Sequence, residues 1–366
     1  MINRKFLFVF ALTTLIVLTG YDWRDGSDNI RFNRSPKNII LFIGDGMGTA
    51  QIYAGMTKND HPLALEKFPF SGFSKTYSAD NYITDSGAGG TALACGIKTN
   101  NGMIGVRPDS TAISSIMAIA HNNGLATGVI STSAVTHATP ASFVAHNADR
   151  GNYEDIAKDF LNGTVDLFIG GGENHFRLRK DSADLTLKLK EQGFDVVYTL
   201  DDLKKSESKK IAGLLAKEHM PTVIEGRSGA LAEMTGKAIE TLSKNKHGFV
   251  LMVEGSMIDW GGHEKNIDYL VSEMIDLDKA IGVAMNFASG DRNTLIVVTA
   301  DHETGGLALT GGSLTDHKLE VSFAGGDHTG VMVPVFSYGP GAEKFSGIHE
   351  NTFFLGEYLN LLKIKM

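Results

Sequence analysis

The segment VEGSMIDWGGH, residues 253–263, holds three side chains that can bind a metal ion: Glu254, Asp259 and His263. Asp259 and His263 are four residues apart, so on a helical turn they share one face and can bind the same ion. Glu254 stands at the end of an apolar run and is directed elsewhere. Met257, Ile258 and Trp260 stand among them, which is not typical of a solvated surface helix. The segment therefore predicts a buried metal site.

Three other short motifs place acids and histidines directly after apolar runs or glycines. They are GDGMG with Asp45, TADHETGG with Asp301 and His302, and GGDHTG with His328. One histidine alone is more often a polar core or surface residue than a ligand, but this repeated placement favours a metal site. Oxygen and nitrogen ligands without thiolate suit zinc, and all-oxygen sets suit Mg²⁺.

The GDGMG motif has an alternative interpretation as a nucleotide-binding loop. It lacks the third glycine of G-x-G-x-x-G, and no lysine stands where a P-loop needs one. We therefore interpret Asp45 as a metal ligand, with glycines that let the backbone approach closely.

Ser86 and Arg150 are candidates for chemistry on an anion. Ser86, in TDSGAGGTALACG, stands where a helix of small residues begins, and a helix N-terminus attracts anions. The alternative is that Ser86 only caps the helix, since no G-x-S-x-G elbow surrounds it. Arg150 ends HATPASFVAHNADR and offers a bidentate fork for phosphate oxygens, although a surface arginine at a helix end is equally consistent with the sequence.

Apolar runs alternate with helical patterns and must position these residues. We predict strands at 38–43, 126–131, 166–169, 194–198, 248–253, 294–299 and 332–337, and helices at 87–95, 111–123, 153–162, 182–192, 228–244, 266–289 and 352–362. Continuous apolar strands between helices indicate an α/β fold, a three-layer α/β/α sandwich around a large, mostly parallel sheet. The candidate residues follow strands, at the edge where ligands bind in such sheets.

The chain ends and the composition bound the remaining possibilities. Arg4 and Lys5 precede an apolar run from residue 6 to 18, so we expect a signal peptide over 1–20, with a buried helix or an uncleaved anchor as alternatives. A polar lead-in over 21–36 and a single catalytic domain over 37–366 follow. The formal net charge of -8 argues against nucleic-acid binding. Cys95, the only cysteine, is expected in the core.

Taken together and in this order, these motifs resemble the alkaline phosphatase family over roughly residues 38–340. The resemblance implies hydrolysis of phosphate monoesters through a phosphoserine at Ser86, with Arg150 binding phosphate. It implies metal ligands in three sets: Asp259, His263 and His328 for a first zinc; Asp45, Asp301 and His302 for a second zinc; and Asp45, Thr139 and Glu254 for a third site, usually magnesium.

Two positions depart from the best-known bacterial pattern. His137 stands where aspartate is common, and we expect it to support the ligands of the third site from behind; imidazole suits zinc better than magnesium. Trp260 stands where lysine is common and removes a cation near the phosphate, so we expect weaker phosphate binding.

The resemblance further implies a homodimer, an exported (periplasmic or secreted) enzyme with no membrane segment in its mature form, and small phosphate monoesters as substrates. We expect a short insertion near 305–327 to leave the site open to a broad range of them. Two rivals are a phosphodiesterase or nucleotide pyrophosphatase, which would lack the third-metal set, and a non-catalytic zinc or phosphate scavenger, which would not need Ser86. A sulfatase is disfavoured because no C/S-x-P-x-R stretch surrounds Ser86.

Overall fold

A computed structural model of the chain describes residues 35–365. The expected signal peptide and most of the polar lead-in lie outside these described residues. Within them, no helix combines the length and apolarity that crossing a bilayer requires.

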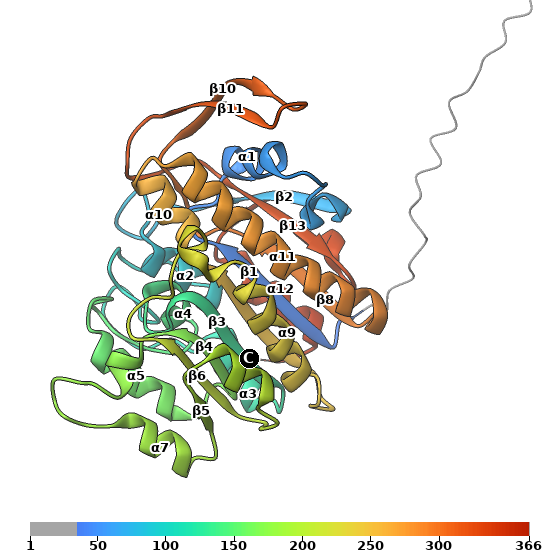
Figure 1. Ribbon diagram of the computed structural model, residues 1–366. Helices are drawn as coiled ribbons and strands as arrows, with labels where there is room; N and C mark the ends of the chain where they lie inside the picture. The colour runs from blue at the N-terminus through green and yellow to red at the C-terminus, as the bar shows by residue number, and fades with distance from the viewer. Residues whose placement is uncertain (1–34, 366) are drawn as a thin grey trace, which may run out of the picture. The chain divides into compact units, whose positions relative to one another are not determined.

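The centre of the fold is a ten-stranded sheet, ordered β14-β2-β13-β8-β1-β7-β3-β4-β6-β5 (Figure 1). Its strands are β1 (Asn38–Gly44), β2 (Phe70–Lys75), β3 (Ala126–Ala134), β4 (Leu167–Gly171), β5 (Asp195–Val197), β6 (Ile211–Ala216), β7 (Phe249–Gly255), β8 (Thr294–Thr299), β13 (Val333–Tyr338) and β14 (Gly347–Glu350). Only β13 runs antiparallel to its neighbours in this sheet. The predicted α/β fold with a mostly parallel sheet is therefore confirmed.

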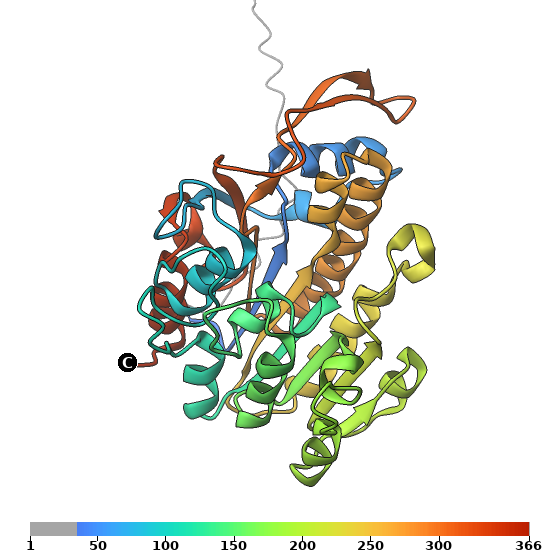
Figure 2. The same cartoon turned by 90° about the vertical axis from the view of Figure 1, so that its left-hand side faces the viewer.

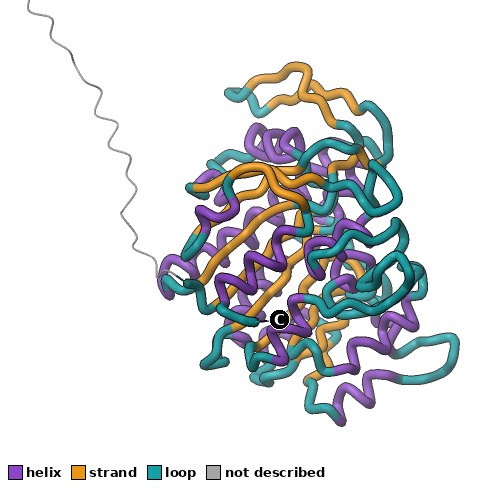
Figure 3. Tube along the Cα trace, turned by 180° about the vertical axis from the view of Figure 1, so that it is seen from behind, coloured by secondary structure: helices purple, strands orange, loops and turns teal. Residues whose placement is uncertain are grey.

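Helices cover both faces of the sheet. The longer ones are α1 (Thr49–Lys58), α2 (Ser86–Cys95), α3 (Ile116–Asn122), α5 (Tyr153–Asp159), α7 (Leu185–Glu191), α9 (Ala230–Leu242), α10 (Met257–His263), α11 (Ile267–Asp291) and α12 (Phe353–Leu362). In Figure 1, α9 and α11 cross the near face, and Figure 3 shows helices across the opposite face of the strands.

The side chains of β1 show why the sandwich has three layers. Successive strand residues point to opposite faces. Ile39 and Leu41 belong to the core shared with α2, α3 and α12, whereas Ile40 and Phe42 belong to the core shared with α1, α9 and α11. Every residue of β1 is buried, and its apolar run over residues 39–43 is continuous rather than alternating.

Several predicted boundaries were wrong. The helix predicted over 111–123 begins only at Ile116, because Ser115 caps it and Ala112 instead forms a bridge with Val106. The helix predicted over 182–192 is shorter, with Asp184 capping its start. The segment 153–162 ends in a 3₁₀ turn, Phe160–Asn162.

The stretch near 305–327 contains a two-stranded hairpin, β10 (Leu307–Ser313) and β11 (Lys318–Phe323). Figure 2 shows this hairpin beside α1. Next to it, β9 (Glu303–Thr304) pairs with β12 (His328–Thr329), which brings the chain before the hairpin back to the chain after it.

Candidate active site

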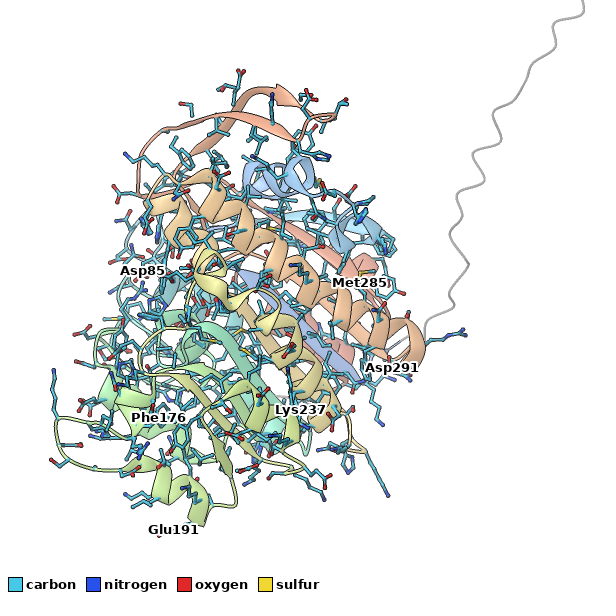
Figure 4. The ribbon with its side chains drawn as sticks, viewed as in Figure 1. Asp85, Phe176, Glu191, Lys237, Met285 and Asp291 are labelled. Atoms are coloured by element: carbon cyan, nitrogen blue, oxygen red, sulfur yellow. The ribbon has the colours of Figure 1, made fainter. Side chains whose placement is uncertain are left out.

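Three neighbouring strands deliver acidic side chains to one edge of the sheet. The strands β8, β1 and β7 are adjacent, and Asp301, Asp45 and Glu254 lie at or just beyond their carboxyl ends. Asp85 lies at this end of the sheet and Asp291 at the other (Figure 4). Gly46 has φ +74, and a Cβ there would lie 2.8 Å from the Cα of Asp259. Glycine therefore allows the close backbone approach expected of GDGMG.

His302 lies at the centre of the cluster and is fully buried. Its Nε2 atom lies 3.3 Å from Oδ1 of Asp45 and 3.4 Å from Oδ2 of Asp301. The ligand atoms of these three residues all lie within 4.8 Å of one another, so the structure brings together the set expected for the second zinc.

A second group contains Asp259, His302 and His328, again within 4.8 Å. Nε2 of His328 lies 3.5 Å from Oδ1 of Asp259. His263 is not in this group, but its Nε2 lies 3.3 Å from Oδ2 of Asp259. The structure thus brings together the residues expected for the first zinc. His302 belongs to both candidate groups.

The histidine tautomers suit metal binding through Nε2. Nδ1 of His328 lies 2.9 Å from the carbonyl oxygen of Thr84, and Nδ1 of His263 contacts the carbonyl oxygen of Gly326. A carbonyl accepts a hydrogen bond, so each Nδ1 carries a proton, and in the neutral ring the lone pair is on Nε2. The hydrogen bond with Asp259 raises the pKa of His263 to about 9 in the metal-free protein, so a metal ion at its Nε2 would displace a proton. Backbone partners of this kind orient the rings of metal-binding histidines.

The third group contains Asp45, His137 and Glu254, also within 4.8 Å. The hydroxyl of Thr139 donates to Oδ2 of Asp45 across 3.5 Å. His137 therefore lies directly among the carboxylates, closer than the supporting position expected for it. Burial, followed by the charges of Arg150 and His219, lowers its pKa to about 3, so its ring is neutral.

The buried carboxylates repel one another and would be stabilised by bound cations. Oδ1 of Asp45, Oδ2 of Asp301, Oε1 of Glu254 and Nδ1 of His137 are buried and have no hydrogen-bond partner. Burial and then the neighbouring acids raise the pKa values of Asp45 and Asp301 well above the ordinary range. Buried charges normally need a partner or a metal. The donor set of carboxylates and imidazoles without thiolate suits zinc.

Ser86 is the first residue of α2 and lies beside this cluster. Its Oγ atom is 3.3 Å from Nε2 of His302. The N-cap is Asp85, whose carboxylate accepts from the N–H of Ala88, so Ser86 does not have the capping role considered as an alternative. Cys95, at the far end of α2, is buried as expected.

Arg150 reaches the same place from the loop before α5. Its NH1 group donates to Oδ2 of Asp85 across 2.8 Å, so it is held against the residue that precedes Ser86. Arg150 is thus not a free surface arginine.

Trp260 forms an aromatic wall next to the third group. Its ring lies edge-on to His219, with centroids 4.8 Å apart, and to His137 at 6.2 Å. His219, from the loop after β6, was not anticipated, nor was Asp85. The N-cap position of Asp85 before a small-residue helix was a visible signal, whereas nothing local marked His219.

Comparison with known proteins bears directly on this geometry. A sequence profile described as alkaline phosphatase matches residues 36–319. The chain belongs to the alkaline phosphatase family. It is 33% identical to alkaline phosphatase 4 of Bacillus subtilis, over 86% of both chains, and 32% identical to the alkaline phosphatase of Escherichia coli, over 87% of this chain and 84% of that one.

Solved structures agree with the family assignment. The alkaline phosphatase from the Antarctic bacterium TAB5 superposes with a TM-score of 0.87 and 43% identity, covering 92% of this chain and all of that one. A cold-active alkaline phosphatase from Shewanella superposes with a TM-score of 0.83 and 30% identity, covering 89% and 99%. As a member of the family, the chain is a phosphomonoesterase.

Proposed function

We propose that the chain hydrolyses phosphate monoesters through a covalent phosphoserine at Ser86, with two zinc ions and a third metal ion. The observation that supports this most directly is the 3.3 Å separation between Oγ of Ser86 and Nε2 of His302, a residue that borders two of the candidate metal groups. A scavenger of zinc or phosphate would not need a hydroxyl in this place.

The metals would be held by Asp259, His263 and His328, by Asp45, Asp301 and His302, and by Asp45, Thr139 and Glu254. When bound, two zinc ions supply Lewis acidity that activates the serine hydroxyl and stabilises charge on the phosphate and leaving oxygens. Two-metal sites of this kind suit in-line displacement at phosphorus.

The residues of the chain perform the remaining steps. Oγ of Ser86 gives up its proton to solvent and forms a bond to phosphorus, while the bond to the departing alcohol oxygen breaks on the opposite side and that oxygen takes a proton from water. Arg150, held by Asp85, donates to the nonbridging oxygens as charge develops. Water then loses a proton and attacks the phosphoserine, the bond between Oγ and phosphorus breaks, and Oγ of Ser86 regains a proton as inorganic phosphate leaves. Two in-line steps predict retention of configuration and transfer to acceptor alcohols.

The decisive experiment combines an assay, metal analysis and trapping of the phosphoenzyme. Purified protein should contain zinc and hydrolyse nitrophenyl phosphate, and a chelator should remove both properties. Ser86→Ala should keep its zinc yet form no phosphoenzyme. A matched control is Ser115→Ala, which removes a serine from the start of α3 and should leave the phosphoenzyme intact. Equal turnover in Ser86→Ala would end the nucleophile assignment.

Phosphodiesterase activity remains the rival to test in parallel. The third group, with Glu254 and Thr139, together with Arg150, supports monoesters. Hydrolysis of a nitrophenyl monoester should therefore exceed that of the matching diester.

The identity of the third ion depends on His137. A variant of the TAB5 enzyme with aspartate in place of a histidine was solved with Mg bound in its M3 site. We propose that His137 lowers the preference of the third site for magnesium in this chain, so that His137→Asp should tighten Mg²⁺ binding. Imidazole is a better ligand for zinc than for magnesium.

We also propose a homodimer and export to the periplasm or medium, with a cleaved signal peptide. Light scattering of the purified protein would test the first. N-terminal sequencing of the mature protein after expression with its full N-terminus would test the second.

A further inference from the structure

Three buried serine hydroxyls form a hydrogen-bonded group beside Glu254. Oγ of Ser131 is 2.6 Å from Oε2 of Glu254, 2.7 Å from Oγ of Ser133 and 3.0 Å from Oγ of Ser256. All four residues are fully buried. We call Ser131, Ser133 and Ser256 the hydroxyl cluster. None of its members belongs to the candidate metal groups.

A bulge in β3 creates the hydroxyl cluster. Ser131 pairs with Glu254 in the register of β3 with β7, whereas the register of β3 with β4 shifts between Ile130 and Ala134. Bulges re-aim side chains next to active sites. Here the bulge is possible because residue 170 is glycine: a Cβ there would lie 2.8 Å from the carbonyl oxygen of Ser131.

The hydrogen-bond directions show that the Ser131 hydroxyl donates to Glu254. The N–H of Ser133 donates to Oγ of Ser131 across 2.9 Å, so the hydroxyl proton of Ser131 is free to point at Glu254. A carboxylate only accepts, and Ser131 therefore donates to Oε2. The other oxygen, Oε1, is buried without a partner and belongs to the carboxylate grouped with Asp45 and His137.

The cluster also connects this carboxylate to α10. Ser256 immediately precedes α10, and its Oγ accepts from the N–H of Ser133 across 3.0 Å. The N–H of Ser256 in turn donates to Oγ1 of Thr132 across 2.9 Å. The bulge thus fixes the start of the helix that carries Asp259 and His263.

We propose that Ser131 is a positioning residue of the third metal site, which holds the Glu254 carboxylate so that Oε1 faces the ion. This inference rests on the proposed function, in which Glu254 binds that ion. Residues that orient metal ligands typically change metal affinity by about 10- to 100-fold when they are removed. Ser131→Ala should therefore weaken binding of the third ion by at least about 10-fold.

The test is a Mg²⁺ titration of full-length enzyme that carries two equivalents of zinc. Bound magnesium is measured by equilibrium dialysis and elemental analysis, and the activation midpoint is measured separately with nitrophenyl phosphate. For Ser131→Ala both midpoints should rise in parallel, while kcat recovers at high Mg²⁺ and KM for the ester stays the same. Ser131→Thr, which keeps the hydroxyl, should restore the normal midpoint.

Two further variants separate the positioning role of Ser131 from a general loss of stability. Ser337→Ala is the matched control, because Ser337 is fully buried and donates one hydrogen bond of 2.8 Å to the carbonyl oxygen of Ala342. It should lower the melting temperature without moving the Mg²⁺ midpoint. If Ser131→Ala does not fold, Ser131→Cys, of similar volume but with a weak donor, replaces it.

The outcomes are distinct. A normal Mg²⁺ midpoint in Ser131→Ala or Ser131→Cys, together with a large loss of Mg²⁺ affinity in Glu254→Gln, would overturn the positioning role and leave the third site standing. A normal midpoint in Glu254→Gln as well would overturn both this inference and the assignment of Glu254 to the third site.

Discussion

The guanidinium of Arg150 lies 2.8 Å from the carboxylate of Asp85, the residue immediately before Ser86. The same carboxylate accepts from the N–H groups of Ala88 and Gly102, each across 2.9 Å. One side chain therefore starts the helix of Ser86, the proposed nucleophile, and also sets the direction of Arg150, the residue proposed to bind phosphate.

Asp85→Ala should remove both the cap of α2 and the contact that holds Arg150. Loss of the N-cap should lower the free energy of unfolding by about 1 kcal/mol. Release of Arg150 should raise KM for the ester and the inhibition constant of phosphate by roughly 10-fold, equivalent to about 1.4 kcal/mol of binding. Steady-state kinetics and urea unfolding measure the two effects.

Asp85→Ser is the matched control for that variant, because serine is also a good N-cap but is too short to reach Arg150. It should keep the stability and still raise KM. If Asp85→Ser behaves like wild type in kinetics, the contact between Arg150 and Asp85 does not position the arginine for phosphate.

Trp260 offers a test of phosphate affinity. Trp260→Lys replaces the indole beside His137 and His219 with a cation and should lower the inhibition constant of phosphate by about fivefold, since a partly exposed ion pair contributes up to about 1 kcal/mol. Slower product release should accompany the tighter binding. Trp260→Phe, which adds no charge, should leave the constant unchanged. An unchanged inhibition constant in Trp260→Lys would contradict a role for this position in phosphate affinity.

The buried acids should lower the free energy of unfolding of the metal-free protein at high pH. Burial, and then the charges of Asp301 and the other acids, raises the pKa of Asp45 well above its ordinary value of 3.8. An acid whose folded pKa is raised contributes stability that is complete below the unfolded pKa and is lost as pH rises through the folded pKa. The metal-free protein should therefore lose stability as the pH rises.

Asp45→Asn removes this loss because an amide cannot ionise. In chelator at pH 9 the variant should be more stable than metal-free wild type, on the order of 3 kcal/mol, the scale of an uncompensated buried charge. The gap should shrink at pH 5. Urea unfolding at both pH values measures it, and an equal gap at the two would show that ionisation of Asp45 is not its cause. The variant should also bind less zinc.

The sequence was sufficient for the parts of the fold that are locally periodic. The runs that became β1, β7 and β8 are buried on both faces and read as continuous apolar strands, so the acids that follow them were predicted correctly to lie at one edge. Strand β2, with the pattern FSGFSK and alternate exposure, carries no such signal. The strand β6, IAGLLA, consists largely of helix-forming residues, and pairing with β4 and β5 overrides that propensity.

The supporting contacts of the site were harder to predict because they join distant segments. Ser131 and Glu254 are 123 residues apart along the chain, and no local pattern marks a serine that will face a carboxylate on the next strand. The bulge of β3 depends on a glycine in β4. Asp85 was an exception, since its position before a small-residue helix could have been identified as an N-cap.

A buried ion network around Arg227 predicts a large effect on stability. Arg227 donates to Asp276 and to Glu273, and the side chains of all three are at most 2% exposed. Nε of Arg227 also donates to the carbonyl oxygen of Pro221 across 2.7 Å. The network therefore fixes the loop between β6 and α9 onto α11, the loop that also carries His219.

Arg227→Ala should lower the free energy of unfolding by about 4 kcal/mol, because it leaves two buried carboxylates without their partner. Burial raises the pKa of Glu273, and Arg227 opposes that rise. Without the arginine the folded pKa should rise further, so stability should be lost as pH increases through it, and the deficit should be larger at pH 8 than at pH 5. Urea unfolding at both pH values measures the deficit.

Lys158→Ala is the control for this variant. It breaks an exposed ion pair with Asp155 and should have no measurable effect on stability. A deficit independent of pH would mean that lost packing, rather than the unpaired carboxylates, destabilises the variant.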